Sequence, residues 1–286
     1  MFKVSAINKI FVTGATGNQG GATVKSLLDK GFSVKALVRN ALNAKFDPHK
    51  NLEIIKGDLN EISSYRQQLQ DCDGVFCNLV FKYGIEKEIK QGFELINASK
   101  ESNIKYFVYS SVIGCDQNTG IPHWESKNKI ENHIKASGIN YTILRPSSLY
   151  ENLLIPQVKS RILKGKLVLP TKKNTVQQFI SSEDIGKIAT TVFSNPEKYQ
   201  GKTINLATEQ MDGEELAATF SKAMGREIKF QQLPMFITRL VMGRDLTKMF
   251  RWINNNDACF VKDLQALRNE FPGMLSLEEW IKINFK

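Results

Sequence analysis

Long apolar runs, paired cysteines and histidines are all scarce in this 286-residue chain. No stretch of about 18 apolar residues occurs, so the sequence predicts no membrane-spanning helix. The 4 cysteines form no CxxC pair and have no histidines at metal-ligand spacing, so we expect neither a disulfide framework nor a metal site. Scattered cysteines in a chain with 42% hydrophobic residues are typical of a large core in the reducing cytoplasm. The lysine-containing start leads straight into a strand-like run, which leaves no room for a signal peptide.

Acidic residues are scarcer than basic ones, 29 against 39, and the formal charge is +10. Such a chain attracts anions, although its charge does not identify which anion. One segment between 152 and 182 has bases and no acid: Lys159, Arg161, Lys164, Lys166, Lys172 and Lys173. It is a solvated face, a rim that steers phosphates or a patch for an acidic partner. Aromatic residues are not interleaved with these bases, and no helix-turn-helix or zinc-finger pattern occurs, so nothing indicates nucleic-acid binding.

In the N-terminal half, short β-branched apolar runs alternate with longer amphipathic runs, which is the pattern of βαβ units. The strand-like runs are 10–13, 33–38, 52–56, 74–79, 105–110 and 141–144. Strands joined by helical crossovers predict an α/β fold with a doubly wound parallel sheet of the Rossmann type.

The pattern becomes less regular after Pro146. A helix start at 181–185, a strand at 203–207 and a helix at 212–224 are expected, and the last part is mostly helical with Leu277 and Trp280 as apolar anchors. We predict two domains. Residues 1–150 form a dinucleotide-binding domain, to which a strand and helix return from about 176–208, and residues 151–286 form a smaller C-terminal region that completes the pocket.

A glycine loop at 13–21 follows the first strand and opens a helix. Its glycines are spaced Gly-x-x-Gly-x-x-Gly, at Gly14, Gly17 and Gly20. In such a loop the first glycine permits a tight turn and the second lets backbone amides approach a pyrophosphate. The third lets the helix lie close to the strand, so that the helix N-terminus faces the pyrophosphate. We therefore predict that this loop binds a dinucleotide.

The end of the second strand indicates which dinucleotide binds. An NAD-selective site usually has an acid there, whereas this chain has Arg39, then Asn40, and no acid before Asp47. A guanidinium can bind a 2′-phosphate through two N–H groups, and an acid would repel it. Arg39 thus predicts NADP+ and NADPH, unless it is only a surface residue. At the end of the third strand, Gly57 precedes Asp58, whose carboxylate can accept the adenine amino group.

The residues usual for hydride transfer on this fold are incomplete. Such an enzyme has a serine at the end of strand five and Tyr-x-x-x-Lys on the next helix. Ser110 and Ser111 occupy the strand end and Lys127 lies on the helix, but His123 stands where the tyrosine is expected. His123 could donate a proton near neutral pH, or could only line the pocket. Lys127 is the expected holder of the nicotinamide ribose.

Several blocks in order along the chain resemble the NmrA-like family of atypical short-chain dehydrogenases/reductases. The blocks are 14–21, 37–40, 90–92, 123–127, 150–154, 243–246, 249–251 and 277–280. They cover essentially the whole chain, and those near its end resemble the branch that contains a redox sensor. The resemblance therefore implies the Rossmann fold and NAD(P) binding.

The resemblance also implies which positions bind NADP. Carried over, they are Gly14, Ala15, Thr16, Gly17, Asn18, Gln19, Arg39, Asn40, Asn43, Leu79, Val80, Phe81, Lys90, Lys127, Leu149, Tyr150, Glu151 and Asn152. At 79–81 this chain departs from its relatives, which tend to have polar residues beside an aromatic one. Contacts there are expected to come from the backbone and from packing.

Two hypotheses about function remain. Regulatory members of the family lack the tyrosine, bind NAD(P) without turnover and act through protein partners, so the first is an NADP(H)-responsive redox sensor. Other relatives are NADPH-dependent reductases, so the second is a reductase of a quinone, dye or enone, assisted by His123 or water. A protein partner, a small hydrophobic electrophile and a homodimer are the partners considered. We favour the sensor, because the tyrosine is missing.

Overall fold

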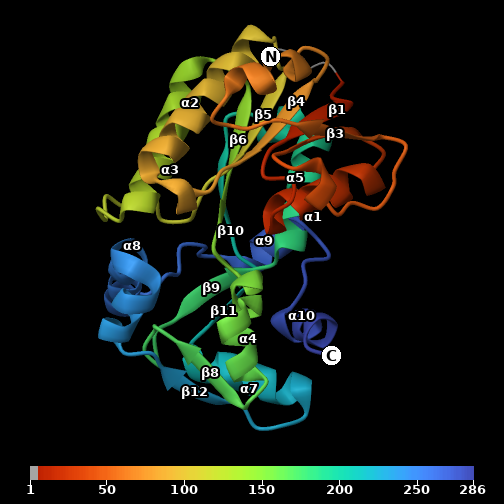
Figure 1. Ribbon diagram of the computed structural model, residues 1–286. Coiled ribbons are helices and arrows are strands. Elements are labelled where there is room, and N and C mark those ends of the chain that lie inside the picture. The colour runs from red at the N-terminus through yellow and green to blue at the C-terminus, as the bar shows by residue number, and fades with distance from the viewer. Residues whose placement is uncertain (1–5) are drawn as a thin grey trace. The chain divides into compact units, whose positions relative to one another are not determined.

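The computed structural model describes residues 6–286, apart from the side chain of Asn43. The chain divides into two compact units. Figure 1 colours the ribbon by residue number, so that the segments of each unit can be located. The first unit comprises residues up to 116, 123–145 and 182–204. The second unit comprises 117–122, 146–181 and 205–286.

A seven-stranded sheet has the strand order β10-β6-β5-β4-β1-β2-β3. Its strands are β1 (Lys9–Val12), β2 (Ser33–Val38), β3 (Leu52–Lys56), β4 (Gly74–Asn78), β5 (Tyr106–Ser110), β6 (Tyr141–Pro146) and β10 (Thr203–Leu206). The pairings β1–β2, β2–β3, β1–β4, β4–β5 and β5–β6 are parallel. The order reverses beside β1, and the predicted α/β fold of the Rossmann type is confirmed.

Helices cover both faces of this sheet. They are α1 (Asn18–Asp29), α2 (Ile85–Glu101), α3 (Pro122–Ser137), α5 (Ser182–Ser194) and the short α6 (Pro196–Tyr199). Figure 1 shows α2 and α3 on one side of the sheet and α1 and α5 on the other. Leu95, Ile96, Ile130 and Ile134 of α2 and α3 pack with strand residues such as Phe107 in one buried apolar cluster. The sheet is therefore covered on both faces, as continuous apolar strands require.

Two connections differ from the expected helical crossovers. The β2–β3 connection has only the 3-10 turn η1 (Ala41–Asn43), and the β3–β4 connection has only η2 (Ile62–Ser64) and η3 (Arg66–Leu69). Polar side chains bond to nearby backbone groups there: the Asn40 oxygen accepts from the Leu42 N–H, and Asp58 accepts from the Asn60 N–H. Such local bonds compete with helix formation, so the prediction of α-helical crossovers is wrong at these two places.

The second unit has two small sheets. One has the order β11-β9-β7 (Glu209–Met211, Gln177–Ile180 and Ser148–Leu149), and the other pairs β12 (Lys229–Gln232) with β8 (Lys166–Leu169). Its helices are α4 (Pro156–Ile162), α7 (Gly213–Met224), α8 (Met235–Asn256), α9 (Leu264–Glu270) and α10 (Leu277–Asn284), with the 3-10 turn η5 at Tyr150–Leu154. Leu277 and Trp280 are buried in its core, as expected of apolar anchors.

No helix in the part of the chain that the structure describes is long and apolar enough to cross a membrane.

The contact between α1 and α5 in the first unit yields a test of packing. A Cβ at Gly186 would lie 2.6 Å from the Ala22 carbonyl oxygen, which is backbone and cannot rotate away. We expect Gly186→Ala to lower the free energy of unfolding by about 1–3 kcal/mol in urea denaturation, because the helices must separate. The neighbouring exposed change Lys187→Ala should cost less than about 0.5 kcal/mol. Equal losses in the two variants would contradict the close packing.

Candidate functional site

The loop between β1 and α1 has the geometry of an anion cradle. Gly14 has a φ of +64°, and a Cβ at Gly20 would lie 2.2 Å from the Gly14 carbonyl oxygen, so both positions require glycine. The Gly17 N–H donates to the same oxygen at 2.9 Å. Gly17 caps α1 without a side-chain hydrogen bond, and the first turn has no acid. The N-terminal N–H groups of α1 therefore suit an anionic group.

A cavity of about 380 Å³ lies beside this loop, within the first unit. It is lined by Gly14, Thr16, Gly17, Leu37, Val38, Arg39, Gly57, Asp58, Leu59, Asn60, Asn78, Leu79, Val80, Lys82, Tyr83, Lys87 and Gln91. These residues follow the carboxyl ends of β1 to β4, where ligands of open parallel sheets bind. The structure thus brings together Gly14, Arg39, Asp58 and Leu79, which the sequence predicts as binding residues at the ends of four different strands.

Arg39 faces Tyr83 across one side of this cavity. Its Nη2 donates to the Tyr83 hydroxyl at 3.0 Å, and the guanidinium carbon lies 4.9 Å from the centre of the ring. This hydrogen bond and the positive charge of Arg39 lower the pKa of Tyr83 below its ordinary value. Lys82 and Lys87 line the same cavity, which therefore combines three cationic side chains with an exposed aromatic ring. Such a surface suits a phosphate next to a planar ring.

Asp58 lies on another part of the lining, in a small polar network. Its Oδ1 accepts from the Asn60 backbone N–H at 2.9 Å and from Asn60 Nδ2 at 2.8 Å. Gln91 Nε2 donates to Asn60 Oδ1 at 2.9 Å and links the turn to α2. The remaining oxygen lone pairs of Asp58 can accept an amino group from a ligand in the cavity.

Several of the predicted binding residues do not line the cavity. Lys90 is exposed and lies 3.7 Å from Glu94, one turn further along α2. Asn18 is the first residue of α1, and Ala15 is buried beneath the loop. The Gln19 oxygen accepts from the Ser110 hydroxyl. A cofactor contact at these positions stays a prediction.

The remaining predicted positions are spread over different elements. The Asn40 side chain caps η1, and the side chain of Asn43 lies outside the described residues. Leu149 ends β7, and Tyr150, Glu151 and Asn152 begin η5 in the second unit. Tyr150 is buried there, and its hydroxyl donates to Glu209 at 3.0 Å.

The sequence-based prediction missed part of the lining on α2 and before it. Lys87 and Gln91 line the cavity, whereas Lys90, between them in sequence, does not. Residues four apart share one face of a helix, and this spacing is the signal that could have identified the pair. The turn η4 (Phe81–Tyr83) supplies Tyr83, whose partner Arg39 is too far away in sequence for any local pattern to indicate.

His123 and Lys127 both lie on α3, near the end of β4. The His123 ring stacks on Phe81 with centres 4.5 Å apart, and the side chain is buried. Lys127 Nζ donates to the Leu79 carbonyl oxygen at 3.0 Å and lies 2.9 Å from Glu88 Oε1. Since Leu79 lines the cavity, the Lys127 ammonium group lies directly behind the cavity wall.

Both serines at the end of β5 donate to protein acceptors. Ser110 donates to Gln19 on α1, and Ser111 donates to Glu131 on α3 at 2.6 Å. A hydride-transfer enzyme of this fold would use a serine hydroxyl to bind its substrate. Neither hydroxyl proton is available for that role in this arrangement.

Glu131 is the centre of a buried polar cluster at the ends of β5 and β6. Arg145 donates to it through Nε at 2.9 Å and Nη2 at 2.7 Å, and the Cys115 thiol donates at 3.0 Å. Burial alone would raise the pKa of Glu131, but the hydrogen bonds from Arg145, Ser111 and Cys115 outweigh it and hold the pKa below its ordinary value. Burial raises the pKa of the Cys115 thiol to about 12, so it stays protonated.

This cluster predicts how stability depends on pH. Because the folded pKa of Glu131 is lowered, its stabilisation is fully present above the unfolded pKa of about 4.3 and is lost as the pH falls through the folded pKa. Glu131→Gln should lower the free energy of unfolding at pH 7 by about 3 kcal/mol, because Arg145 loses its buried partner. It should also flatten the fall in stability below about pH 4.3.

Urea denaturation at pH 7 and at several acidic values measures both effects. Glu183→Gln, which removes an exposed carboxylate paired with Lys187 at 2.9 Å, is the matched control. An unchanged acid dependence in Glu131→Gln would contradict the role assigned to this carboxylate.

The basic stretch at 159–173 belongs to the second unit, where several of its side chains contact that unit's own backbone and acids. Lys159 donates to the Asn284 carbonyl oxygen and Lys172 to that of Asn254. Lys173 lies 3.2 Å from Glu214. These contacts agree with a solvated face, one of the alternatives considered.

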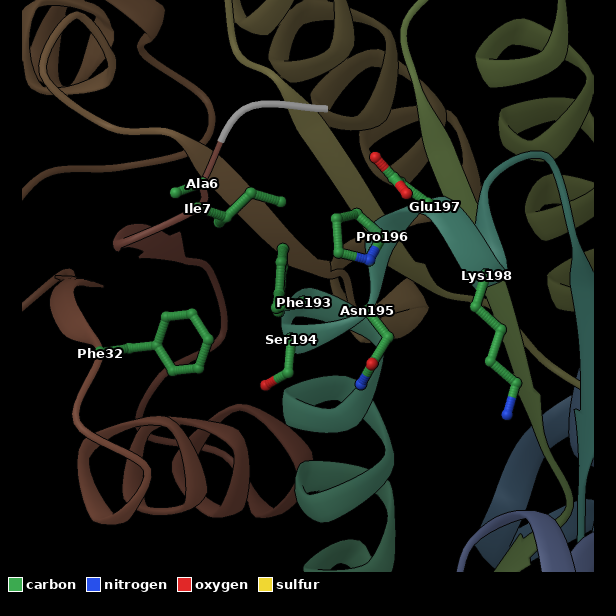
Figure 2. A pocket seen from close by; sticks show the side chains of 9 residues that line it. All are labelled: Ala6, Ile7, Phe32, Phe193, Ser194, Asn195, Pro196, Glu197 and Lys198. Carbon is green, nitrogen blue, oxygen red and sulfur yellow. The ribbon is translucent and has the colours of Figure 1, made fainter. Parts of the chain in front are cut away.

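A second cavity, of about 480 Å³, lies at the amino ends of the strands (Figure 2). Ala6 and Ile7 precede β1, Phe32 precedes β2, and the rest of the lining is the segment 193–198. Ligands of parallel sheets bind at the carboxyl ends, so this cavity is not the candidate site. Among the described residues, no three His, Cys, Asp or Glu side chains are grouped as metal ligands.

Comparison with known proteins gives a match along nearly the whole chain. A model of the NmrA-like family matches residues 7–281, which confirms the family resemblance of the sequence. Photosystem II assembly factor Ycf39 of Trieres chinensis is 27% identical over 268 residues, which cover 92% of this chain and 83% of the relative.

Solved structures share the fold at lower identity. The triphenylmethane reductase of Citrobacter sp., complexed with NADP(H), is 21% identical with a TM-score of 0.81, covering 96% of this chain and 99% of that one. NmrA, a negative transcriptional regulator in complex with NADP, is 19% identical with a TM-score of 0.79, covering 98% of this chain and 96% of that one.

Proposed function

The chain belongs to the NmrA-like family, and from this premise we propose that it binds NADP(H) and acts as a nucleotide-responsive regulator, a redox sensor. The observation that carries the proposal is the cavity beside the glycine loop, where Arg39, Lys82 and Lys87 meet Tyr83. The triphenylmethane reductase, which shares this fold, was solved with NADP(H), and NmrA, which shares it too, was solved with NADP and with NAD.

The residues present fit NADP(H) part by part. The N-terminus of α1, which no side chain caps, suits the pyrophosphate, and Gly20 lets α1 lie close to the loop that would hold it. Arg39 and the two lysines suit the 2′-phosphate, because an ionic hydrogen bond favours the phosphate over a hydroxyl. When bound, NADPH would bring a hydride to the site. We carry over the predicted contact of Lys127 with the nicotinamide ribose as part of this proposal.

A regulatory role is favoured by how the polar groups near β4 and β5 are used. Ser110 and Ser111 donate to Gln19 and Glu131, and Lys127 lies 2.9 Å from Glu88. A reductase of this fold would use such groups on its substrate. A regulator needs only that the nucleotide binds two conformations unequally, by about 5.5 kcal/mol for a shift from 1:99 to 99:1.

The second candidate is an NADPH-dependent reductase, which is favoured by the aromatic pair of Phe81 and His123 next to the cavity wall. A cationic triphenylmethane dye becomes neutral when it accepts a hydride and needs no proton. Its reduction would therefore not require the missing tyrosine, whereas reduction of a quinone would need a proton from His123 or water. A protein partner, a homodimer and a cytoplasmic location remain predictions under either function.

The preference for the phosphorylated nucleotide tests the proposal. We expect Arg39→Ala to weaken NADP+ binding by about tenfold to a hundredfold, because a charged hydrogen bond contributes about 1.5–3 kcal/mol. NAD+ binding should change little, since NAD+ lacks the 2′-phosphate. Isothermal titration calorimetry measures both affinities, with Arg66→Ala, an exposed arginine distant in sequence, as the control. Equal affinity of the wild type for NADP+ and NAD+ would refute the predicted selectivity.

A turnover assay separates the two candidate functions. The protein is incubated with NADPH and a panel of quinones, triphenylmethane dyes and aldehydes, and the loss of absorbance at about 340 nm is followed, a wavelength set by the dihydronicotinamide chromophore. The regulator predicts no turnover, together with protease protection of 150–175 that depends on nucleotide. Turnover that His123→Ala or Lys127→Ala abolishes would overturn the regulator and establish the reductase.

A further inference from the structure

Glu88 and Lys127 form a buried ion pair that the proposed function does not yet use. Their side chains are 0% and 8% exposed, and Lys127 Nζ lies 2.9 Å from Glu88 Oε1. Ser126 donates to the other oxygen, Glu88 Oε2, at 2.5 Å. The pair connects α2 to α3, and a buried charge is tolerated only because its partner neutralises it.

The position of the pair is next to the nucleotide site. Lys127 also donates to the carbonyl oxygen of Leu79, and Leu79 lines the cavity immediately after β4. A dinucleotide on a doubly wound sheet crosses the point where strand order reverses. Arg39 follows β2 on one side of β1, and Leu79 follows β4 on the other side. A nucleotide whose 2′-phosphate is bound by Arg39 therefore has its nicotinamide half on the β4 side, towards Lys127.

The ammonium group of Lys127 donates to the Leu79 carbonyl oxygen, forms an ion pair with Glu88 at 2.9 Å and lies 5.5 Å from the centre of the Tyr109 ring. The predicted contact with the nicotinamide ribose would use an N–H of this ammonium group. Because Glu88 compensates the charge, Lys127 acts there as a hydrogen-bond donor without leaving a net positive charge near the nicotinamide ring.

This compensation matters because the two redox forms differ in charge. The nicotinamide ring carries a positive charge in NADP+ and none in NADPH. A nearby cation without a partner would repel the charged ring of NADP+ but not the neutral ring of NADPH. A nearby anion without a partner would attract the ring of NADP+ and leave NADPH unaffected. We propose that Glu88, through its pairing with Lys127, determines how the protein discriminates between NADP+ and NADPH. The inference rests on the proposed binding of NADP(H).

The test compares the ratio of the dissociation constants of NADP+ and NADPH in four proteins. The ratio is measured at pH 6, where a buried lysine without its partner keeps its charge more fully, and at pH 8, where a buried glutamate without its partner does so. Glu88→Gln leaves Lys127 unbalanced, so the ratio should rise by about fivefold to tenfold, the effect of one charge at about 10 Å in a partly screened site. Lys127→Met leaves Glu88 unbalanced, so the ratio should fall by a similar factor. The double variant has no net charge and should return close to the wild-type ratio.

Loss of the Lys127 contact with the ribose weakens the binding of NADP+ and of NADPH equally, because both have the same ribose. It therefore does not change the ratio of their dissociation constants. Glu101→Gln, an exposed carboxylate on the same helix, should leave the ratio unchanged. Adenosine 2′,5′-bisphosphate, which lacks the nicotinamide half, should bind all variants as it binds the wild type. If Glu88 had a purely structural role, Glu88→Gln would also weaken the binding of adenosine 2′,5′-bisphosphate. The ratio of the two dissociation constants would then change in no defined direction.

An unchanged ratio in Glu88→Gln, or a shift that persists in the double variant, overturns the inference. If Glu88→Gln does not fold, the double variant is compared with Lys127→Met. These two proteins differ only in the charge of residue 88, so the ratio must be higher in the double variant. Failure of the wild type to bind either adenosine 2′,5′-bisphosphate or NADP(H) would instead overturn the proposed function.

Discussion

The close contact of α1 with the loop that follows β1 is the constraint on which the site depends. A Cβ at Gly20 would lie 2.2 Å from the Gly14 carbonyl oxygen, so the helix can occupy this place only with glycine there. The same approach directs the N-terminus of α1 to the carboxyl ends of the strands. α5 continues the layer, because Gly186 lets it approach the backbone of α1 equally closely. Small residues on two helices thus hold the anion cradle against the sheet.

Charge is distributed in two different ways at this end of the sheet. Around the cavity, Arg39, Lys82 and Lys87 are exposed and can meet an anion. Behind the cavity wall and at the end of β6, the charges are buried and balanced, Lys127 by Glu88 and Arg145 by Glu131. Exposed cations give affinity for phosphate, whereas balanced pairs fix the geometry without adding net charge. This division agrees with the proposed binding of a phosphorylated nucleotide at the cavity.

Much of the fold could be predicted from the sequence, because each strand is a local apolar run and each helix has its own periodicity. The prediction was wrong where Asn40 and Asp58 bond to adjacent backbone and replace a helix by a 3-10 turn. Within the site, Lys90 was chosen by resemblance, while Lys87 and Gln91 line the cavity. The orientation of α2 decides which of its residues line the cavity. Residues next to each other in a helix point to different faces, so Lys87 and Gln91 face the cavity and Lys90 does not.

The sequence by itself determined the parallel sheet, the glycine loop and the arginine at the end of β2, because each depends on residues adjacent along the chain. The tertiary structure decided what those residues contact. Arg39 meets Tyr83, and Lys127 meets Glu88, across separations of 44 and 39 residues. Such partners are chosen by the packing of α2 and α3 on the sheet, which no local pattern encodes. For that reason the sequence alone indicates the family and the glycine loop, whereas the charge balance between Lys127 and Glu88 is visible only in the tertiary structure.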